Sequence, residues 1–235
     1  MKRVSGVRNN NWYLLLFCIF CIQLLTTSSN AQFNIKTGYS LSYNSPDVSS
    51  QLFSDFNTTN DDWLDNKFKD FRWMHGLHLG GRYLIAETVG IELGWITKFD
   101  KTDAEGITLN VEDFYRKYFY SLNQLHFALE SIVTDHFGIG ASINYDILSI
   151  KARYEDKGSK SRILRDNNYS SNFFITYYTD SSNGVRFALR PYVRVPWTSL
   201  NYRDLSNDLN ETSGTEALPD KTLHFGISLL FFNGN

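Results

Sequence analysis

The chain has 235 residues, of which 16% are aromatic and 20% are charged, and its formal net charge is −2. This length is sufficient for one all-β domain. Because the chain has no excess of basic residues, nucleic acid is excluded as an expected partner.

The first 31 residues have the organisation of a secretory signal peptide. A basic start is followed by an apolar run from Trp12 to Leu25, and small residues follow up to Ala31. The apolar run is shorter than the roughly 20 residues that a membrane-spanning helix needs. We therefore predict cleavage before Gln32 and a mature domain over residues 32–235, the alternative being an uncleaved signal anchor.

Both cysteines, Cys18 and Cys21, lie inside this apolar run. The small residues of a lipoprotein signal do not precede either one, so lipidation is not expected. Cleavage leaves a mature chain without a disulfide or a thiolate metal site. A closed, hydrogen-bonded barrel in lipid is one way to stabilise such a secreted domain.

Segments of the mature chain alternate apolar and polar residues with the period of two that is typical of strands. Their lengths approach the roughly 9–11 residues of a tilted membrane strand. The segments lie at residues 33–41, 77–83, 89–99, 125–130, 137–146, 172–178, 185–195 and 223–231. This pattern predicts an all-β fold, an eight-stranded antiparallel up-and-down transmembrane β-barrel.

Two positions interrupt the alternation. Tyr118, Tyr120 and Leu122 are apolar on the opposite parity from the residues that follow, which predicts a β-bulge near residues 123–124. Pro191 lies within the seventh segment and has no amide hydrogen, so we expect a local bulge or a missing ladder bond there.

The connections between the segments are alternately long and short. In outer-membrane barrels the long ones face outward and the short turns face the periplasm. The long ones cover residues 44–72, 100–117, 155–169 and 198–221, and the short ones lie near residues 87, 135 and 180–184. A turn centred on Glu87 predicts that Arg82 lies opposite Glu92 on the polar face.

The apolar face of such a barrel contacts either lipid outside or a ligand inside, as in soluble lipocalin-like barrels. Long apolar faces, and polar faces that combine glycine with long charged residues, favour lipid outside. Aromatic residues at the segment ends predict two girdles. They are Tyr43, Trp95, Phe99, Tyr118, Tyr120, Tyr145 and Trp197 at the outward end, and Phe33, Tyr83, Phe137, Tyr177 and Phe231 at the other.

Residues 76–82 (GLHLGGR), 89–95 (VGIELGW) and 137–142 (FGIGAS), with the Phe-rich last segment, resemble small outer-membrane β-barrel proteins of the OmpX, OmpA-transmembrane-domain and PorT-like kind. The resemblance covers the architecture of most of the mature chain. It implies an outer-membrane location, contact with outer-membrane lipid and lipopolysaccharide, and delivery by the barrel-assembly machinery. One departure is that Phe232 is followed by residues 233–235 instead of ending the chain.

The polar face of the segments carries nine charged residues that we expect inside the barrel. An eight-stranded barrel is filled by its side chains, and charges buried there must be paired. We therefore predict a salt-bridged plug, the alternative being an anion-preferring path along the arginines. The residues are Lys36, Arg82, Glu92, Lys98, Glu130, Asp146, Arg186, Arg190 and Arg194.

The histidines are not expected to form a metal or catalytic site. His78, His126 and His224 lie on the polar faces of different segments without ligand-like spacing. No strand has a His-x-Ser motif, and no Ser–His–acid set is apparent. We expect no enzymatic activity and no cofactor.

The long connections contain acidic clusters and many aromatic residues. The acids are expected to be solvated, with a Ca²⁺ or lipopolysaccharide-bridging site as the alternative; they are Asp61, Asp62, Asp65, Asp204, Asp208 and Glu211. The first connection is expected to fold as a cap or to contact a partner or lipid headgroups. Its candidate contact residues are Trp63, Phe68, Phe71 and Trp73.

These patterns predict a non-enzymatic integral outer-membrane barrel with a plugged lumen. It would act through its extracellular loops in adhesion, in envelope integrity or in assembly with another envelope protein. Two alternatives remain open: a small anion-preferring pore or carrier of amphipathic solutes, and a lipid-modifying enzyme.

Overall fold

The computed structural model describes residues 32–235 except 86–87, 109–111, 156–157, 181–184 and 234–235. The predicted signal peptide, residues 1–31, lies outside the described residues. So does Glu87, the predicted centre of the first short turn.

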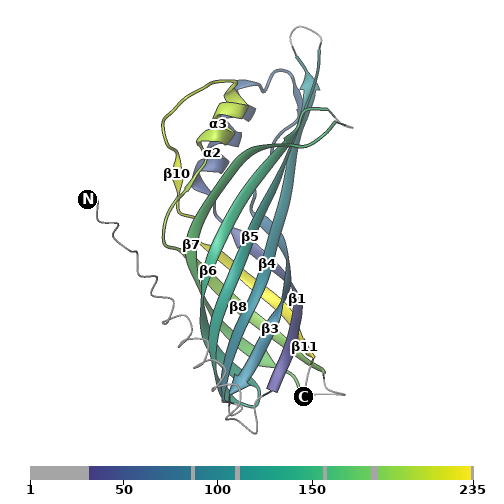
Figure 1. The fold of residues 1–235 in the computed structure, drawn as a ribbon. Coiled ribbons are helices and arrows are strands. Elements are labelled where there is room, and N and C mark those ends of the chain that lie inside the picture. Colours follow the sequence, from purple (N-terminus) through teal and green to yellow (C-terminus); the bar gives the residue numbers. More distant parts are fainter. Residues whose placement is uncertain (1–31, 86–87, 109–111, 156–157, 181–184, 234–235) are drawn as a thin grey trace, which may run out of the picture.

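Eight long antiparallel strands close into a ring (Figure 1). They are β1 (Gln32–Asn44), β3 (Trp73–Ile85), β4 (Val89–Ile107), β5 (Asp113–Thr134), β6 (Phe137–Arg153), β7 (Ser161–Tyr178), β8 (Val185–Pro196) and β11 (His224–Asn233). Each pairs with its neighbours in sequence, and β1 pairs with β11 to close the ring. The predicted eight-stranded up-and-down barrel is confirmed.

Five short elements lie at the end of the barrel where β1 ends and β3 begins. They are α2 (Asp47–Thr59), β2 (Leu64–Asn66), β9 (Leu200–Asn201), α3 (Arg203–Asn210) and β10 (Pro219–Asp220). Figure 1 shows α2 and α3 close together at that end. No helix in the described part of the chain is long and apolar enough to cross a membrane.

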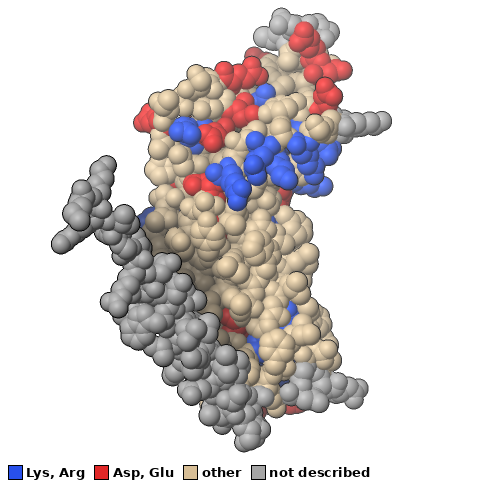
Figure 2. Space-filling model, in the orientation of Figure 1, with Lys and Arg blue, Asp and Glu red and all other residues tan. Residues whose placement is uncertain are grey.

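Over most of each strand, odd-numbered side chains point outward and even-numbered side chains point inward; a register shift against β6 reverses this parity at the start of β7, where Arg162 points outward. The outward residues form a wide apolar belt, where for example Leu79 is 63% and Leu93 60% exposed. Figure 2 shows this belt as a zone with few charges beneath a charged end. A continuous exposed apolar surface of this kind is covered by lipid in a barrel whose polar face lies inside.

Aromatic side chains border the belt at both ends. Tyr145, Tyr169 and Trp197 follow one another at the outward end, with ring centroids 5.4 and 6.1 Å apart. Phe187 and Phe231 pack at 4.8 Å at the short-turn end. An antiparallel barrel with an apolar belt between two aromatic girdles is the architecture of an outer-membrane protein, and the chain has this architecture.

The bulge predicted near residues 123–124 is wrong. Strand β5 pairs with β4 and β6 without a register shift at this point. Tyr118 and Tyr120, which we predicted in the outward girdle, are instead buried inside, at 0% and 2% exposure. The strand continues beyond the lipid, where the inside of the barrel is apolar and the outside meets water. Its inward side chains therefore change from polar to apolar and its outward side chains from apolar to polar, without any change in which residues point inward.

Two of the four predicted long connections are mostly strand. In the connection predicted at residues 100–117, β4 and β5 remain paired as far as Ile107 and Asp113. In the one predicted at residues 155–169, β7 already begins at Ser161. Figure 1 shows the β4–β5 hairpin rising beyond the rest of the barrel. The outward side chains of these extensions are polar, which is why the sequence resembled loops.

Pro191 interrupts the ladder between β7 and β8. Pairing reaches Phe174–Tyr192 and resumes at Tyr177–Leu189 in the same register. The predicted missing ladder bond is therefore confirmed, without a bulge.

The lipid-facing belt predicts that a charge on the outward face of β4 destabilises the protein more, the nearer it lies to the centre of the bilayer. We expect Leu93→Arg to lower the free energy of unfolding in lipid vesicles by about 2–4 kcal/mol, since arginine near the bilayer centre loses its hydration. The control is Glu105→Arg, on the same outward face of β4 but beyond the belt, which should have little effect. Equal effects in urea unfolding would contradict the membrane placement.

Candidate functional site

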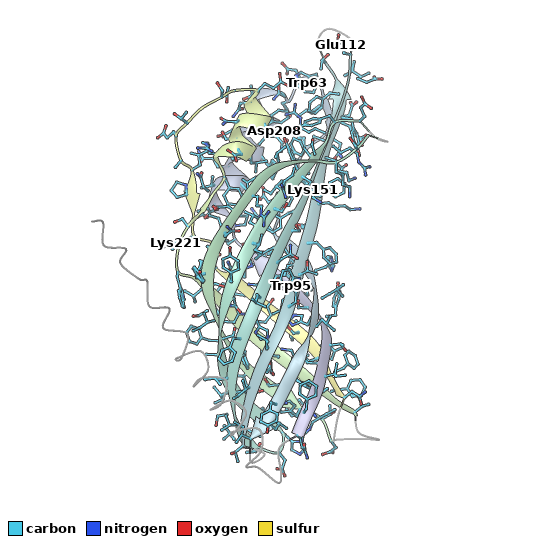
Figure 3. The ribbon with its side chains drawn as sticks, in the orientation of Figure 1. Trp63, Trp95, Glu112, Lys151, Asp208 and Lys221 are labelled. Carbon is cyan, nitrogen blue, oxygen red and sulfur yellow. The ribbon has the colours of Figure 1, made fainter. Side chains whose placement is uncertain are left out.

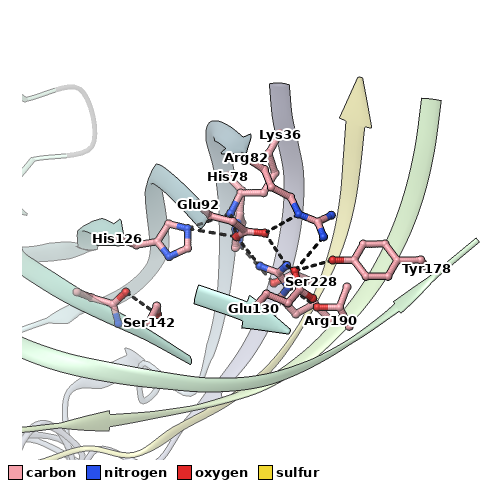
Figure 4. A network of polar contacts seen from close by, with 12 residues as sticks. Lys36, His78, Arg82, Glu92, His126, Glu130, Ser142, Tyr178, Arg190 and Ser228 are labelled. Atoms are coloured by element: carbon pink, nitrogen blue, oxygen red, sulfur yellow. Dashed lines mark hydrogen bonds and ion pairs between the residues drawn. The ribbon is translucent and has the colours of Figure 1, made fainter. Parts of the chain in front are cut away.

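A network of charged side chains fills the half of the lumen nearer the short turns, which we call the lower half; Figure 4 shows its contacts. We define the lumenal network as Lys36, Arg82, Glu92, Glu130 and Arg190. All five side chains are buried. They come from five strands, β1, β3, β4, β5 and β8, so the network connects opposite walls of the ring.

Glu92 accepts hydrogen bonds from two members of this network. Arg190 donates to both of its carboxylate oxygens, over 2.8 and 2.7 Å, in a bidentate pair. Lys36 Nζ donates to Oε2 over 2.6 Å. Arg82 lies opposite Glu92 in the β3–β4 ladder, as predicted, with Nε 4.0 Å from Oε1.

Glu130 lies beside Glu92 and shares its cations. Its Oε2 accepts from Arg190 over 3.1 Å and from the Tyr178 hydroxyl over 2.6 Å, and lies 3.4 Å from Arg82 Nη2. The Arg82 guanidinium lies over the rings of Tyr178 and Phe232, each 4.9 Å from the centroid. Two carboxylates are thus surrounded by three cations, which compensates much of the cost of burying them.

Glycines on the inward parity make room for these side chains. A Cβ atom at Gly138 would lie 2.4 Å from Glu130 Oε1, and one at Gly90 would lie 2.9 Å from Arg82 Nε. Any larger residue at Gly138 would therefore displace the Glu130 carboxylate.

A second charge pair occupies the lumen nearer the cap. Arg194 donates to Asp146 Oδ2 over 2.5 Å, and Gln124 donates to Oδ1 over 2.6 Å. Lys98 is also buried, and its ammonium lies 4.7 Å from the centre of the Tyr192 ring. In the described part of the chain it has no hydrogen-bond acceptor, but it lines a cavity of about 20 Å³, which is room for one water molecule.

Arg186 lies apart from the other eight predicted lumenal charges. It is on the inward parity, but at the short-turn rim, half-exposed, where it donates to the carbonyls of Thr179 and Asp135 over 3.0 and 2.7 Å. The three arginines of β8 therefore occupy three separate levels with different partners. They do not form one continuous row.

The lumenal histidines lie among these charges. His126 Nε2 is 2.9 Å from Lys36 Nζ and accepts a hydrogen bond from it, because an ammonium can only donate. His78 and His224 are buried on other strands. Among the described residues, no group of three or more His, Cys, Asp or Glu could hold a metal ion.

An apolar cluster, the cap core, closes the end of the barrel opposite the short turns. Phe53 of α2 is fully buried, with its ring 5.1, 5.3 and 5.8 Å from those of Phe68, Phe71 and Tyr118. Leu205 and Leu209 of α3 are buried in the same cluster. The first and fourth connections thus fold onto the barrel.

The four candidate contact residues of the first connection separate into three environments. Phe68 and Phe71 are 4% and 0% exposed in the cap core, so the first connection folds as a cap, the first of our two alternatives, and these two side chains are not accessible as contact residues. Trp73 is 56% exposed and packs against Tyr43 in the outward girdle. Trp63 is half-buried against Phe114.

The acids of the fourth connection attach α3 to the tall hairpins. Asp208 accepts hydrogen bonds from the hydroxyls of Tyr118, over 2.6 Å, and Tyr154. Arg116 pairs with Glu211 over 3.1 Å and donates to the Asp208 carbonyl. Burial together with the hydrogen bond to Asp208 raises the pKa of Tyr154 to about 12. Asp208 is thus structural and differs from the solvated acid we predicted, whereas the Glu211 side chain is exposed, as predicted, while it pairs with Arg116.

A groove of about 390 Å³, the cap groove, lies between α2, the start of β5 and α3. Its aromatic wall consists of Phe56, Trp63 and Phe114, and Arg116 and Glu211 provide charge. The Trp63 and Phe114 rings meet edge to face at 5.0 Å. The groove thus combines aromatic and charged lining residues.

Strand alternation places Phe174 and Tyr178 on the polar face, but it does not predict that lumenal aromatic rings cover the arginines. Phe174 lies 4.1 Å from the Arg190 guanidinium carbon, and Tyr178 and Phe232 cover Arg82. Their even numbers were the available signal, because these positions share the parity of the polar, inward residues of β7 and β11.

No family model matches this chain, and no curated protein matches it. Among solved structures it is similar to Ail, the attachment invasion locus protein of Yersinia pestis, in complex with sucrose octasulfate. That match has 10% identity, a TM-score of 0.43 and coverage of 85% of this chain and 98% of that one. The outer membrane protease OmpT of Escherichia coli matches with 9% identity, a TM-score of 0.42 and coverage of 89% and 98%. At these identities the likeness concerns the fold alone.

The lumenal network predicts a large loss of stability when one carboxylate is removed. We expect Glu92→Gln to lower the free energy of unfolding by about 3–5 kcal/mol, because Arg190 and Lys36 lose their shared partner. Denaturant unfolding in vesicles measures this.

The matched control is Arg186→Gln at the rim, which should change stability by less than about 0.5 kcal/mol. Adding Lys36→Met to Glu92→Gln removes one unpaired cation and should recover part of the loss. A Glu92→Gln protein as stable as the wild type would contradict the role of this network.

Proposed function

We propose that this protein is a non-conducting, non-enzymatic outer-membrane anchor that acts through its folded extracellular cap. The observation that carries the proposal is the double closure of the barrel. The lumenal network fills the lower half, and the cap core covers the outward mouth.

The cap is a folded structure that is larger than the connections between strands require. Two helices, two tall hairpins and a buried aromatic cluster form it, and Asp208 and Arg116 join its parts. Because the cap is ordered in this way, a partner would meet a preformed surface and little conformational entropy would be lost on binding. Adhesion, envelope integrity and assembly with another envelope protein are roles that suit such a surface.

Planar-bilayer recording tests the closure. We expect no steady current from the wild-type protein, since paired charges and apolar side chains leave no continuous water path. A positive control replaces Lys36, Glu92, Glu130 and Arg190 with alanine and removes α2, its folding being checked by heat-modifiable migration on a gel. A steady anion-selective wild-type current would instead support the small-pore alternative.

Mass analysis of lipid A from cells with and without the protein tests the enzymatic alternative. An unchanged lipid profile is expected. A new deacylated or otherwise modified species that depends on the protein would overturn the non-enzymatic assignment.

A substitution in the cap groove tests whether the protein functions through its cap. Trp63→Ala should reduce cell adherence or resistance to detergent, because it removes the aromatic wall of the groove. Trp95→Ala, in the lipid-facing girdle, is the matched control and should leave both unchanged. Protease resistance of the cap must be equal in the two variants, and equal phenotypes would contradict the role of the groove.

A further inference from the structure

A second groove lies on the outer wall of the barrel, where the lipid-facing belt meets the tall hairpins. We name it the collar groove; its volume is about 540 Å³. Its main lining residues are Phe99, Asp100, Lys101, Phe119, Lys151 and Lys160. It is separate from both the lumenal network and the cap groove.

Strand register brings the basic residues of this groove together. Lys101 of β4 pairs with Phe119 of β5, Phe119 pairs with Lys151 of β6, and Lys151 pairs with Arg162 of β7. Adjacent strands are about 4.8 Å apart, so Lys101 and Lys151 flank the Phe119 ring at about 10 Å from each other. The Lys160 ammonium lies over that ring, 3.6 Å from its centroid.

The positive charge of the collar groove is largely uncompensated. Among the described residues, Lys101, Lys151 and Lys160 form no ion pair within 4 Å, whereas exposed cations elsewhere do, such as Lys67 with Asp61 and Arg72 with Asp70. The one carboxylate in the lining, Asp100, accepts a hydrogen bond from the Lys101 amide. Three ammonium groups against one carboxylate favour an anionic ligand.

The groove lies at the depth of lipid headgroups. Phe99, 42% exposed, belongs to the outward end of the belt, and Lys101 follows it on the same face of β4, about 7 Å further along the strand. The headgroup layer is about 5–7 Å thick on each side of the hydrocarbon. Figure 2 shows Lys and Arg gathered directly above the belt, and Figure 3 places Lys151 above Trp95, on the side of the cap.

We propose that the collar groove binds the phosphorylated headgroup of a glycolipid in the outer leaflet. Phosphate oxygens would accept from Lys101, Lys151 and Lys160, while Phe99 and Phe119 would contact the sugar and the upper acyl chains. Lysine suits this task as a mobile point charge for phosphate. This site goes beyond the proposed function, which concerns the cap.

A membrane lipid fits this groove better than a soluble polyanion does. The aromatic floor at Phe99 is continuous with the lipid-facing belt, so a lipid reaches the site by lateral diffusion and remains there at high local concentration. The net charge of −2 gives the whole chain no long-range attraction for polyanions.

Lipid retention by the full chain tests the proposal. The protein is placed in phosphatidylcholine nanodiscs that contain either bis-phosphorylated lipid A or the same lipid after phosphate removal, and bound lipid is counted by native mass spectrometry. Wild type should retain the phosphorylated lipid at least about tenfold better than the triple variant Lys101→Gln, Lys151→Gln, Lys160→Gln, since that variant loses the three cations that would contact the phosphates.

Two controls separate charge from folding. The same three positions changed to arginine should retain the lipid, and Lys67→Gln with Arg72→Gln, on the cap, should have no effect. Heat-modifiable migration must be unchanged in every variant used.

Equal retention by wild type and the triple variant, or no preference for the phosphorylated lipid, would overturn the proposal. So would a triple variant that loses binding of a soluble sulfated polysaccharide but keeps the lipid, because the groove would then be a polyanion site. Bilayer conductance is independent of these outcomes, so failure here is distinguishable from failure of the proposed function.

Discussion

The bidentate pair between Arg190 and Glu92 is the interaction on which the arrangement of the lumen depends. It joins β8 to β4 across the ring, and the same guanidinium reaches Glu130 on β5. A ring of eight strands is too narrow to hydrate such charges freely, so each must find its partners within the wall. The glycines at 90 and 138 and the rings that cover the guanidinium groups follow from this requirement.

A second constraint acts along the barrel axis. Within the belt the outward face is apolar and the lumen is polar, whereas beyond it the outward face is polar and the inside is apolar. Strand β5 makes this exchange without a register shift: Gln124 bonds Asp146 inside the membrane, and Leu122 and Tyr120 belong to the cap core. The protein therefore combines an inside-out membrane barrel with a cap packed like that of a water-soluble domain, on the same continuous strands.

The sequence was sufficient to predict what depends on local periodicity. Alternation identified the eight strands, and turn symmetry identified the Arg82–Glu92 register. It was insufficient where polarity reverses: the upper parts of β4, β5 and β7 alternate in the opposite sense and resembled loops or a bulge. The Arg190–Glu92 pair joins strands that are not neighbours in the ladder, and the burial of Phe68 and Phe71 depends on how a loop folds, so neither follows from strand periodicity.

The collar also bears on how the barrel enters its membrane. Lys101, Lys151 and Arg162 lie on the outward face of β4, β6 and β7, between the lipid-facing belt and the upper ends of these strands. Each must cross hydrocarbon once during insertion, at a cost of about 2–4 kcal/mol at the midplane. The same cost opposes the reverse passage, so these charges stabilise the inserted orientation kinetically. The barrel, once inserted, therefore resists slipping back through the bilayer or inverting its orientation.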